Sequence, residues 1–254
     1  MSRLVVISNR LADPRKPAAG GLAVALGEAL NQTGGLWFGW SGTVVEGGTP
    51  GEGELHTRQA GAVTLATVDL CREDHDSYYH GYSNSVLWPV FHYRLDLADF
   101  NASYIAGYRR VNQMFARKLL PLLRDDDVIW VHDYHLIPLA AELRAMGCKQ
   151  RIGFFLHIPM PPPLIMAAIP QHEWLMRSLF AYDLVGLQSA ADVAHFSRTP
   201  LTRWKPTRTC ATSIRAGACC WASTGSTTPR ASRTACGPSA SCWTATPKTG
   251  AARR

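Results

Sequence analysis

The sequence predicts an α/β fold in which a parallel sheet carries helices on both faces. Two observations support this prediction. Short apolar runs of strand length are followed repeatedly by segments whose apolar residues recur every three or four positions, as on a helix. The connections between them are short and rich in glycine or proline, as in successive βα units. Such units build a doubly wound, Rossmann-like sheet.

The first predicted βα unit lies at the amino end. Residues 4–8 form a continuous apolar run, which predicts a buried strand, and a loop containing Gly20 and Gly21 follows it. The apolar residues within 22–30 share one stripe of a helix that ends near Gly34. The other elements predicted in this half are strands at 36–40 and 63–68 and a loop or hairpin at 46–53.

Three further βα units are predicted in the second half, each from an apolar run that leads directly into a helix-like segment. The strands are predicted at 127–132, 151–158 and 184–187, with helices near 137–146, around 170–180 and from Ser189 onward. A long amphipathic segment at 104–123 precedes all three units. Because ligands of such sheets bind beyond the carboxyl ends of the strands, the side chains directly after each strand are the candidates for a site.

Polar side chains stand at three of these positions. Arg10 follows the first strand, Asp133 and Tyr134 follow the strand at 127–132, and His157 lies at the end of the next. The sequence therefore predicts that these side chains gather at one edge of the sheet. Taken alone, Arg10 could equally be an ordinary surface cation.

A metal site at His132, Asp133 and His135 is an alternative that the residues leave open. Three-residue histidine spacing suits a helix, whereas these residues leave a strand, so we do not expect a metal there. His132 is expected to be a packed, hydrogen-bonded imidazole.

The chain contains neither the dinucleotide glycine fingerprint nor the phosphate-loop motif near its first helix. What remains is Gly20 and Gly21 at the start of a helix, where backbone N–H groups can approach a diphosphate closely. A helix-entry turn without a ligand is the alternative. The missing fingerprint disfavours a nicotinamide oxidoreductase.

The formal net charge of +7 belongs to the carboxyl-terminal segment. Residues 199–254 hold nine Lys or Arg and no Asp or Glu; removing these nine from the 26 basic residues leaves 17 against 19 acidic ones, a net charge of −2 for residues 1–198. We therefore expect neither nucleic acid nor a membrane as partner. The odd total of seven cysteines and the absence of a signal peptide or membrane-length apolar stretch predict a cytoplasmic protein with reduced thiols.

Residues 199–254 differ from the rest of the chain in charge, cysteine content and apolar content together. Leu201 and Ile214 are the only branched aliphatic residues, so little can be buried to offset the entropy lost on ordering. We predict one domain at 1–198 and a basic, Cys-rich, disordered tail at 199–254. The abrupt change suggests a shifted reading frame; a genuine basic tail is the alternative.

Six strings in the first 161 residues resemble a known enzyme family. They are SNR at 8–10, AGGLAVAL at 19–26, GLWFGWSG at 35–42, YYHGYSNSVLWPVFHYR at 78–94, WVHDYHL at 130–136 and FFLHIPMP at 154–161. In order and approximate spacing they resemble the N-terminal half of the UDP-forming trehalose-6-phosphate synthase family, glycosyltransferase family 20. This resemblance implies the N-terminal domain of a two-domain, GT-B type glycosyltransferase.

The resemblance assigns roles residue by residue. The positions implied for the acceptor glucose-6-phosphate are Arg10, Trp40, Tyr79, Trp88, Asp133 and Tyr134. The positions implied for the donor side are Gly20 and Gly21 over the diphosphate and His157 against the donor glucose, with His157 and Asp133 as the catalytic pair. Trp37 and Trp130, from the same strings, are expected to be core residues.

The implied reaction transfers glucose from UDP-glucose to glucose-6-phosphate with retention of configuration. The resemblance implies no cofactor and no metal, so cationic side chains and backbone N–H groups must stabilise the leaving diphosphate. Only one good carboxylate, Asp133, stands in the site strings, which favours assistance by the leaving phosphate over a double displacement.

The second Rossmann domain of the family is missing after His195, so we expect this chain to be inactive or impaired. Two other functions stay open: a non-catalytic sugar-phosphate-binding protein, and a metal-dependent hydrolase using His132, Asp133, His135 and His157. A homo-oligomer is possible.

Overall fold

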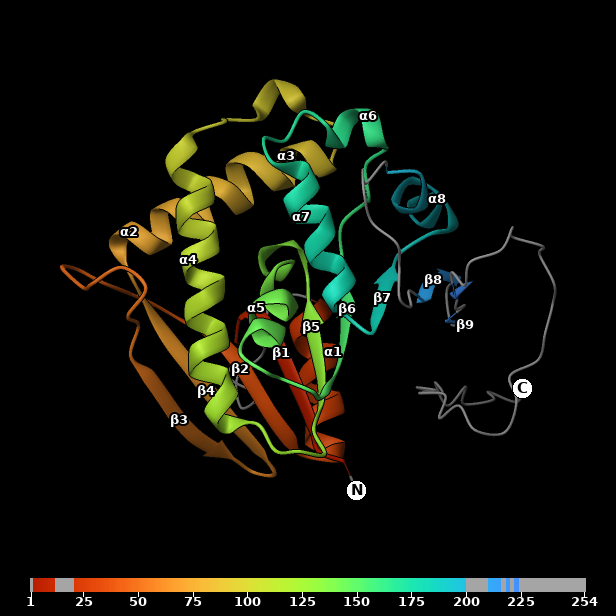
Figure 1. The fold of residues 1–254 in the computed structure, drawn as a ribbon. Helices are drawn as coiled ribbons and strands as arrows, with labels where there is room; N and C mark the ends of the chain where they lie inside the picture. Colours follow the sequence, from red (N-terminus) through yellow and green to blue (C-terminus); the bar gives the residue numbers. More distant parts are fainter. Residues whose placement is uncertain (1, 12–20, 200–209, 216–217, 220–221, 224–254) are drawn as a thin grey trace, which may run out of the picture.

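A computed structural model describes residues 2–11, 21–199, 210–215, 218–219 and 222–223 of the 254-residue chain (Figure 1). The strands of its main sheet are β1 (Leu4–Arg10), β2 (Gly35–Val45), β3 (Leu55–Ala60), β4 (Val63–Cys71), β5 (Val128–His132), β6 (Arg151–Phe155) and β7 (Leu184–Leu187). The helices are α1 (Gly21–Thr33), α2 (Arg72–Asp74), α3 (Trp88–Phe91), α4 (Ala102–Leu119), α5 (Leu139–Ala145), α6 (Pro163–Met166), α7 (His172–Ser178) and α8 (Ala190–Arg198). The remaining helical segments are η1 (His75–Leu87), η2 (Leu95–Leu97), η3 (Leu120–Leu122), η4 (Tyr134–Leu136) and η5 (Leu179–Ala181).

The sheet is doubly wound about its central strand. Its order is β7-β6-β5-β1-β2-β4-β3, and all neighbours are parallel except β3, which runs antiparallel to β4. From β1 the chain builds outward through β2 and β4 on one side and, after returning, through β5, β6 and β7 on the other. The strand order therefore reverses between β1 and β5, which is where sheets of this kind bind ligands.

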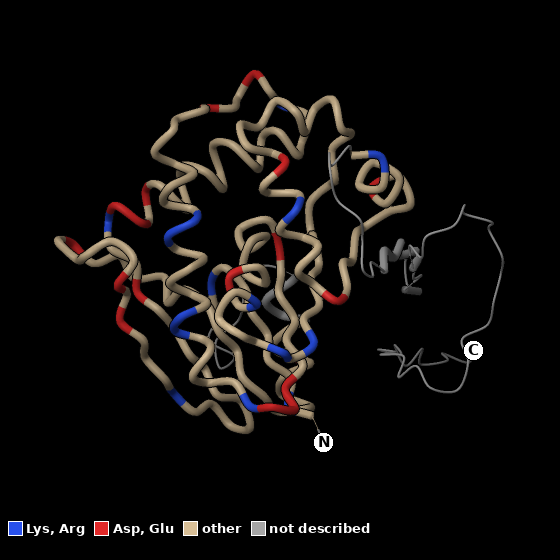
Figure 2. Tube along the Cα trace, in the orientation of Figure 1, with Lys and Arg blue, Asp and Glu red and all other residues tan. Residues whose placement is uncertain are grey.

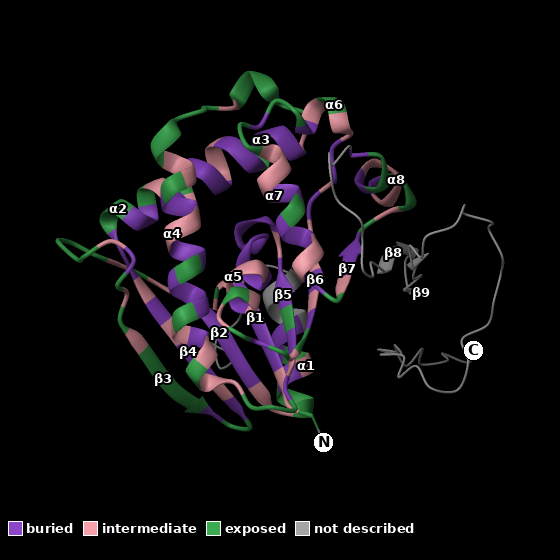
Figure 3. Ribbon diagram, in the orientation of Figure 1, coloured by how far each residue is buried: buried purple, intermediate pink, exposed green. Residues whose placement is uncertain are grey.

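Helices cover both faces of the sheet, as the sequence predicts. Val5 and Ile7 of β1 belong to a large core, while Val6 between them belongs to a smaller one on the opposite face. The large core lies under η1, α4, α5 and α7; the smaller one is covered by α1 through Leu26 and Leu30 (Figure 1). Figure 3 shows the buried residues concentrated in the strands and on the inner sides of these helices.

Three parts of the chain depart from the sequence-based prediction. β3 was not predicted because its residues, LHTRQA, are mostly polar and exposed; it is an edge strand that pairs with β4 alone in the described residues. The segments η1 and α3 were not predicted because the string at 78–94 is rich in Tyr, Ser and Asn rather than in periodic aliphatic residues. Most of the predicted strand at 151–158 is confirmed, but β6 ends at Phe155.

The remaining predicted elements are confirmed, and caps explain several of their ends. Ser189 accepts a hydrogen bond from the backbone N–H of Asp192 and so caps α8, as predicted. Asn101 caps α4 in the same way, and Gly147 follows α5 with φ +89°.

Part of the predicted tail is described. Within it lie β8 (Cys210–Arg215), β9 (Ala218–Cys219) and β10 (Ala222–Ser223), and β8 extends the sheet by pairing in parallel with β7. The rest of the tail lies outside the described residues, so the disordered tail and the shifted reading frame stay predictions.

Charge is distributed evenly along the described part of the chain. Figure 2 shows basic and acidic residues interspersed on the trace, which agrees with the small net charge of residues 1–198. Among the described residues no helix combines the length and the apolar character that crossing a bilayer requires.

Candidate active site

Arg10, the last residue of β1, lies beside Trp40 of β2 and Tyr79 of η1. The Arg10 guanidinium carbon is 5.5 Å from the centre of the Trp40 ring, within the range of a cation–π contact. The Trp40 ring lies 5.5 Å from that of Tyr79, which η1 presents from the side. Arg10 is exposed, so its charge remains accessible beside a wall of rings.

A glycine makes the position of Arg10 possible. Gly42 follows Trp40 with φ +90°, and a Cβ at this residue would stand 2.6 Å from Nε of Arg10. Only a residue without a side chain allows both the backbone conformation and this close approach. Gly42 is therefore a site residue that the motif reading missed, although its GLWFGWSG string was recognised.

His135 joins this group to the polar residues after β5. Its ring stacks on Tyr79 at 5.8 Å and contacts the Tyr134 ring at 4.0 Å. Neither ring nitrogen of His135 has a hydrogen-bond partner in the described structure, and burial lowers its pKa to about 3. His135 is thus an uncharged spacer between two tyrosines, a role that its spacing from His132 did not suggest.

Asp133 connects the ends of two strands. Its backbone has φ +74°, an uncommon conformation for a residue with a side chain, and its N–H donates to the carbonyl of Phe155. Its Oδ1 accepts hydrogen bonds from the N–H groups of Tyr134 at 3.0 Å and His157 at 3.2 Å. The carboxylate is therefore held where the chain leaves β5, next to the end of β6.

Burial also changes the acidity of this carboxyl group. Desolvation raises the pKa of Asp133 from 3.8 to about 6, although the two backbone N–H donors and the charge of His92 act in the opposite direction. A carboxyl with this pKa accepts hydrogen bonds when ionised and can donate one when protonated.

Buried His132 and half-buried His157 form a hydrogen-bonded imidazole pair. Nε2 of His157 is 2.9 Å from Nδ1 of His132, so one nitrogen carries the shared proton. Burial lowers the pKa of His157 to about 4, and burial with the nearby His157 lowers that of His132 to about 3. Both rings are therefore neutral at pH 7, and His132 is the packed, hydrogen-bonded imidazole that the sequence predicts.

The segment η4, which carries Tyr134, is fixed by distant side chains. The Tyr134 carbonyl accepts a 2.6 Å hydrogen bond from the hydroxyl of Tyr108, the His135 carbonyl accepts from Asn112, and the Leu136 carbonyl accepts from Tyr182. The Tyr134 hydroxyl is 2.8 Å from Oδ1 of Asn84 on η1. Asn84, like Gly42, is a residue of the site that motif reading missed.

Trp88 is the predicted residue least connected to the others. It is 41% exposed and stacks on His92 at 4.2 Å, and none of its described ring contacts involves Arg10, Trp40 or Tyr79. Its connection to the site is through His92, which is one of the groups that lower the pKa of Asp133. Exposure of a large ring at this edge is what a ligand-contacting position requires.

The remaining predicted residues divide into three outcomes. Gly20 lies outside the described residues, and Gly21 is the first residue of α1. Trp37 is buried and donates its indole N–H to Ser8, so its prediction as core is confirmed. The prediction for Trp130 is wrong: it is 37% exposed, because it points to the α1 side of β5 while α1 contacts β1 and β2 instead.

The fold and the site together define the class of protein. This is a Rossmann-like α/β domain of the GT-B glycosyltransferase type, in which a guanidinium, stacked rings, a carboxylate and a neutral imidazole gather at the strand-order reversal.

Comparison with known proteins gives the family. The sequence profile of glycosyltransferase family 20 matches residues 7–204, and the chain belongs to that family. A trehalose-6-phosphate synthase of Enterobacter sp. (strain 638) is 53% identical over 194 residues, which are 76% of this chain and 40% of that protein. That of Sinorhizobium fredii is 54% identical over 204 residues, 78% of this chain and 43% of the relative.

Solved structures agree with this assignment. The UDP-forming alpha,alpha-trehalose-phosphate synthase of Burkholderia xenovorans in complex with glucose-6-phosphate has a TM-score of 0.75 and 50% identity, covering 82% of this chain and 45% of that one. An E. coli structure bound with UDP-2-fluoro glucose has a TM-score of 0.70 and 51% identity, over 78% and 42% of the two chains. This chain thus spans about two fifths of the length of these relatives.

Proposed function

We propose that this chain carries the acceptor side of a retaining glycosyltransferase that transfers glucose from UDP-glucose to glucose-6-phosphate, forming trehalose-6-phosphate. The observation that carries the proposal is the grouping of Arg10, Trp40 and Tyr79 near the strand-order reversal. The rings of His135 and Tyr134 connect this group to Asp133. A phosphate needs a cation, a sugar ring packs on aromatic faces, and sugar hydroxyls need hydrogen-bond acceptors. The Burkholderia relative that binds glucose-6-phosphate supports the choice of ligand.

In this proposal the acceptor phosphate binds to the exposed guanidinium of Arg10. Trp40, which is buried, together with Tyr79 and the exposed Trp88 shapes the place where the sugar binds, and Tyr134 contributes its hydroxyl group. Asp133 accepts hydrogen bonds from sugar hydroxyls and orients the one that attacks, because its carboxylate is fixed by two backbone donors.

On the donor side, neutral His157 bonds the transferred glucose, and Gly20 with Gly21 opens α1 toward the diphosphate. We propose that no metal takes part and that cationic side chains and backbone N–H groups stabilise the leaving diphosphate. A double displacement of the kind that retaining glycosidases use needs two carboxylates about 5 Å apart, whereas the site strings supply one good carboxylate, Asp133. Assistance by the leaving phosphate is therefore the preferred route to retention.

Calorimetry with glucose-6-phosphate tests the acceptor side directly. We expect measurable binding to this chain, and a loss on the order of tenfold or more in Arg10→Ala, because a charge-assisted contact to phosphate is worth about 1.5–3 kcal/mol. Arg151→Ala is the matched control, since Arg151 is also exposed but stands at the opposite end of β6. Equal binding of glucose-6-phosphate by the parent and by Arg10→Ala would refute the proposed phosphate site.

Turnover separates an enzyme from a sugar-phosphate-binding protein. We expect negligible formation of UDP from UDP-glucose and glucose-6-phosphate by these 254 residues alone, because they span about two fifths of the length of the relatives and a site of this kind is formed between two domains. Turnover at the rate of a full-length relative would contradict this expectation.

We further propose a cytoplasmic location, for which the two described free thiols, Cys71 and Cys148, are the support. Self-association, a possibility for this chain, is measurable by sedimentation.

A further inference from the structure

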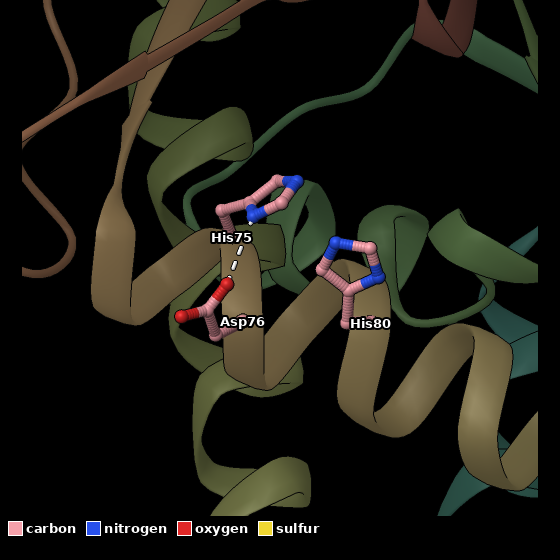
Figure 4. Close-up of side chains that lie close together, drawn as sticks. All are labelled: His75, Asp76 and His80. Atoms are coloured by element: carbon pink, nitrogen blue, oxygen red, sulfur yellow. Dashed lines mark hydrogen bonds and ion pairs between the residues drawn. The ribbon is translucent and has the colours of Figure 1, made fainter.

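His75, Asp76 and His80 form a cluster of potential metal ligands on η1. One nitrogen of each imidazole and one oxygen of the carboxylate all lie within 4.8 Å of one another. Figure 4 shows a ring nitrogen of His80 directed toward His75 and Asp76, with the hydrogen bond between the latter two marked. Among the described residues this is the one group of three such side chains at that spacing.

The winding of η1 brings the two histidines together. In an α-helix, residues five apart point about 140° away from each other, since each residue advances about 100°. Over residues 75–87 the hydrogen bonds run to the fifth residue, as from Trp88 to the Ser83 carbonyl, so each residue advances by a smaller angle. His75 and His80 therefore lie on one side of η1, with their rings in edge contact at 4.5 Å.

We propose that His75, Asp76 and His80 bind a divalent transition-metal ion of the Zn²⁺ class. Two imidazoles with one carboxylate suit Zn²⁺, Co²⁺, Ni²⁺ or Cu²⁺ rather than Mg²⁺ or Ca²⁺, which prefer sets made of oxygen alone. Asp76 and His80 are exposed, so the ion enters from solvent and water completes its coordination.

The spacing requires little rearrangement. Two ligand atoms about 2.1 Å from one ion are about 3.0–3.4 Å apart at the angles metals adopt. Nδ1 of His75 and Oδ1 of Asp76 are already 3.0 Å apart, so an ion can replace the proton between them. His80 closes the remaining gap by side-chain rotation, which its exposure allows. Arg72 and Arg110 are nearby cations, and ion pairs offset their charges: Arg72 pairs with Glu46, and Arg110 pairs with Glu73 and Asp74.

The proposed ion site adjoins the acceptor site but takes no part in the transfer. His75 contacts the Trp40 ring at 5.3 Å and stacks on Tyr79 at 5.6 Å. The proposed ion site therefore lies next to two aromatic residues of the acceptor site. The inference rests on η1 alone and stands whether or not the proposed function is correct.

Titration with Co²⁺, followed by visible absorbance, tests the site in the full chain. Accessible thiols are first alkylated with iodoacetamide, because thiolates compete for such ions. We expect binding of Co²⁺ with imidazole-type absorption and without a thiolate charge-transfer band. In His80→Asn and Asp76→Asn we expect affinity to fall on the order of tenfold or more, since loss even of groups that only support ligands has effects of that size.

His56→Asn is the matched control, because His56 is an exposed imidazole beside two carboxylates, Glu54 and Asp69, yet lies outside the cluster. Its affinity for Co²⁺ is expected to equal that of the parent. Absence of binding by the parent, or equal binding by the parent and both cluster variants, overturns the proposal. Circular dichroism of each variant checks that it keeps the secondary-structure content of the parent.

Discussion

Replacement of Asp133 by asparagine tests the electrostatics of the proposed site. Asparagine has nearly the same shape, tolerates the positive φ, and its Oδ1 can accept the same two backbone hydrogen bonds. Unlike aspartate, it carries no charge at any pH. Asp133→Asn therefore removes the ionised form while leaving the connection between β5 and β6 intact.

The size of the effect follows from the pKa of Asp133. The rise from 3.8 to about 6 means that ionisation is disfavoured in the folded protein by about 3 kcal/mol, at about 1.36 kcal/mol per pKa unit. Below pH 3.8 the carboxyl is protonated in both states and contributes nothing. Between pH 3.8 and about 6 the unfolded chain releases this proton while the folded protein keeps it, so the folded protein loses stability over that range and the loss is complete above it. Asp133→Asn should therefore be more stable than the parent by about 1.5 kcal/mol at pH 5 and about 3 kcal/mol above pH 7.

Denaturant unfolding at a series of pH values between 5 and 8 measures this difference. Asp126→Asn is the control, because Asp126 is exposed in the turn before β5, and its curve should run parallel to that of the parent. If the stability of Asp133→Asn also runs parallel to that of the parent, with no gain in unfolding free energy that grows with pH, then the ionised Asp133 carboxylate does not destabilise the folded protein and the reasoning is refuted.

Three further predictions concern the packing of two glycines, a buried ion pair and a buried histidine. Gly39→Ala should lower the free energy of unfolding by about 2 kcal/mol or more, because the new Cβ would stand 2.1 Å from a β1 carbonyl oxygen. Gly27→Ala in α1 is the control: its Cβ would have its nearest neighbour at 3.9 Å, and the change should stabilise the protein by about 0.5–1 kcal/mol. Equal effects of the two changes in thermal melts would contradict this. Arg3→Ala should lower the free energy of unfolding by about 3–5 kcal/mol, since it leaves the buried Asp127 carboxylate without its two hydrogen bonds from the guanidinium. A loss below about 1 kcal/mol in urea unfolding would be inconsistent with that pairing. Burial lowers the pKa of His135 to about 3, so the folded protein loses stability as pH falls below 6.5. His135→Phe should reduce the stability lost between pH 6.5 and 5 by about 2 kcal/mol. An unchanged slope of stability against pH in this variant would argue against the buried, neutral histidine.

The sequence was most informative where one physical rule decides the outcome. Strand-length apolar runs gave the parallel strands, and the rule that ligands bind beyond strand ends selected Arg10, Asp133 and His157 before any contact was known. All three lie at that edge. The roles that family resemblance assigned to them remain proposals.

The contacts that connect the site depend on three-dimensional packing that no local pattern records. His135 bridges two tyrosines from different elements, and Gly42 is required by a guanidinium 32 residues earlier in the chain. The same limit explains the error at Trp130: strand alternation sets which side a ring faces, but not whether a helix covers that side. β3 was not predicted because an exposed edge strand can form without alternating apolar and polar residues.

The three hydrogen bonds to the carbonyls of η4 have a consequence for how this protein tolerates change. Two come from the interior of α4 and one from Tyr182, so the loop that presents Tyr134 is shaped by parts of the chain that a ligand never touches. A loop already in its bound shape loses little conformational entropy on association. Random mutagenesis screened for sugar-phosphate affinity should therefore recover substitutions at Tyr108 and Tyr182 as readily as at residues of the pocket itself.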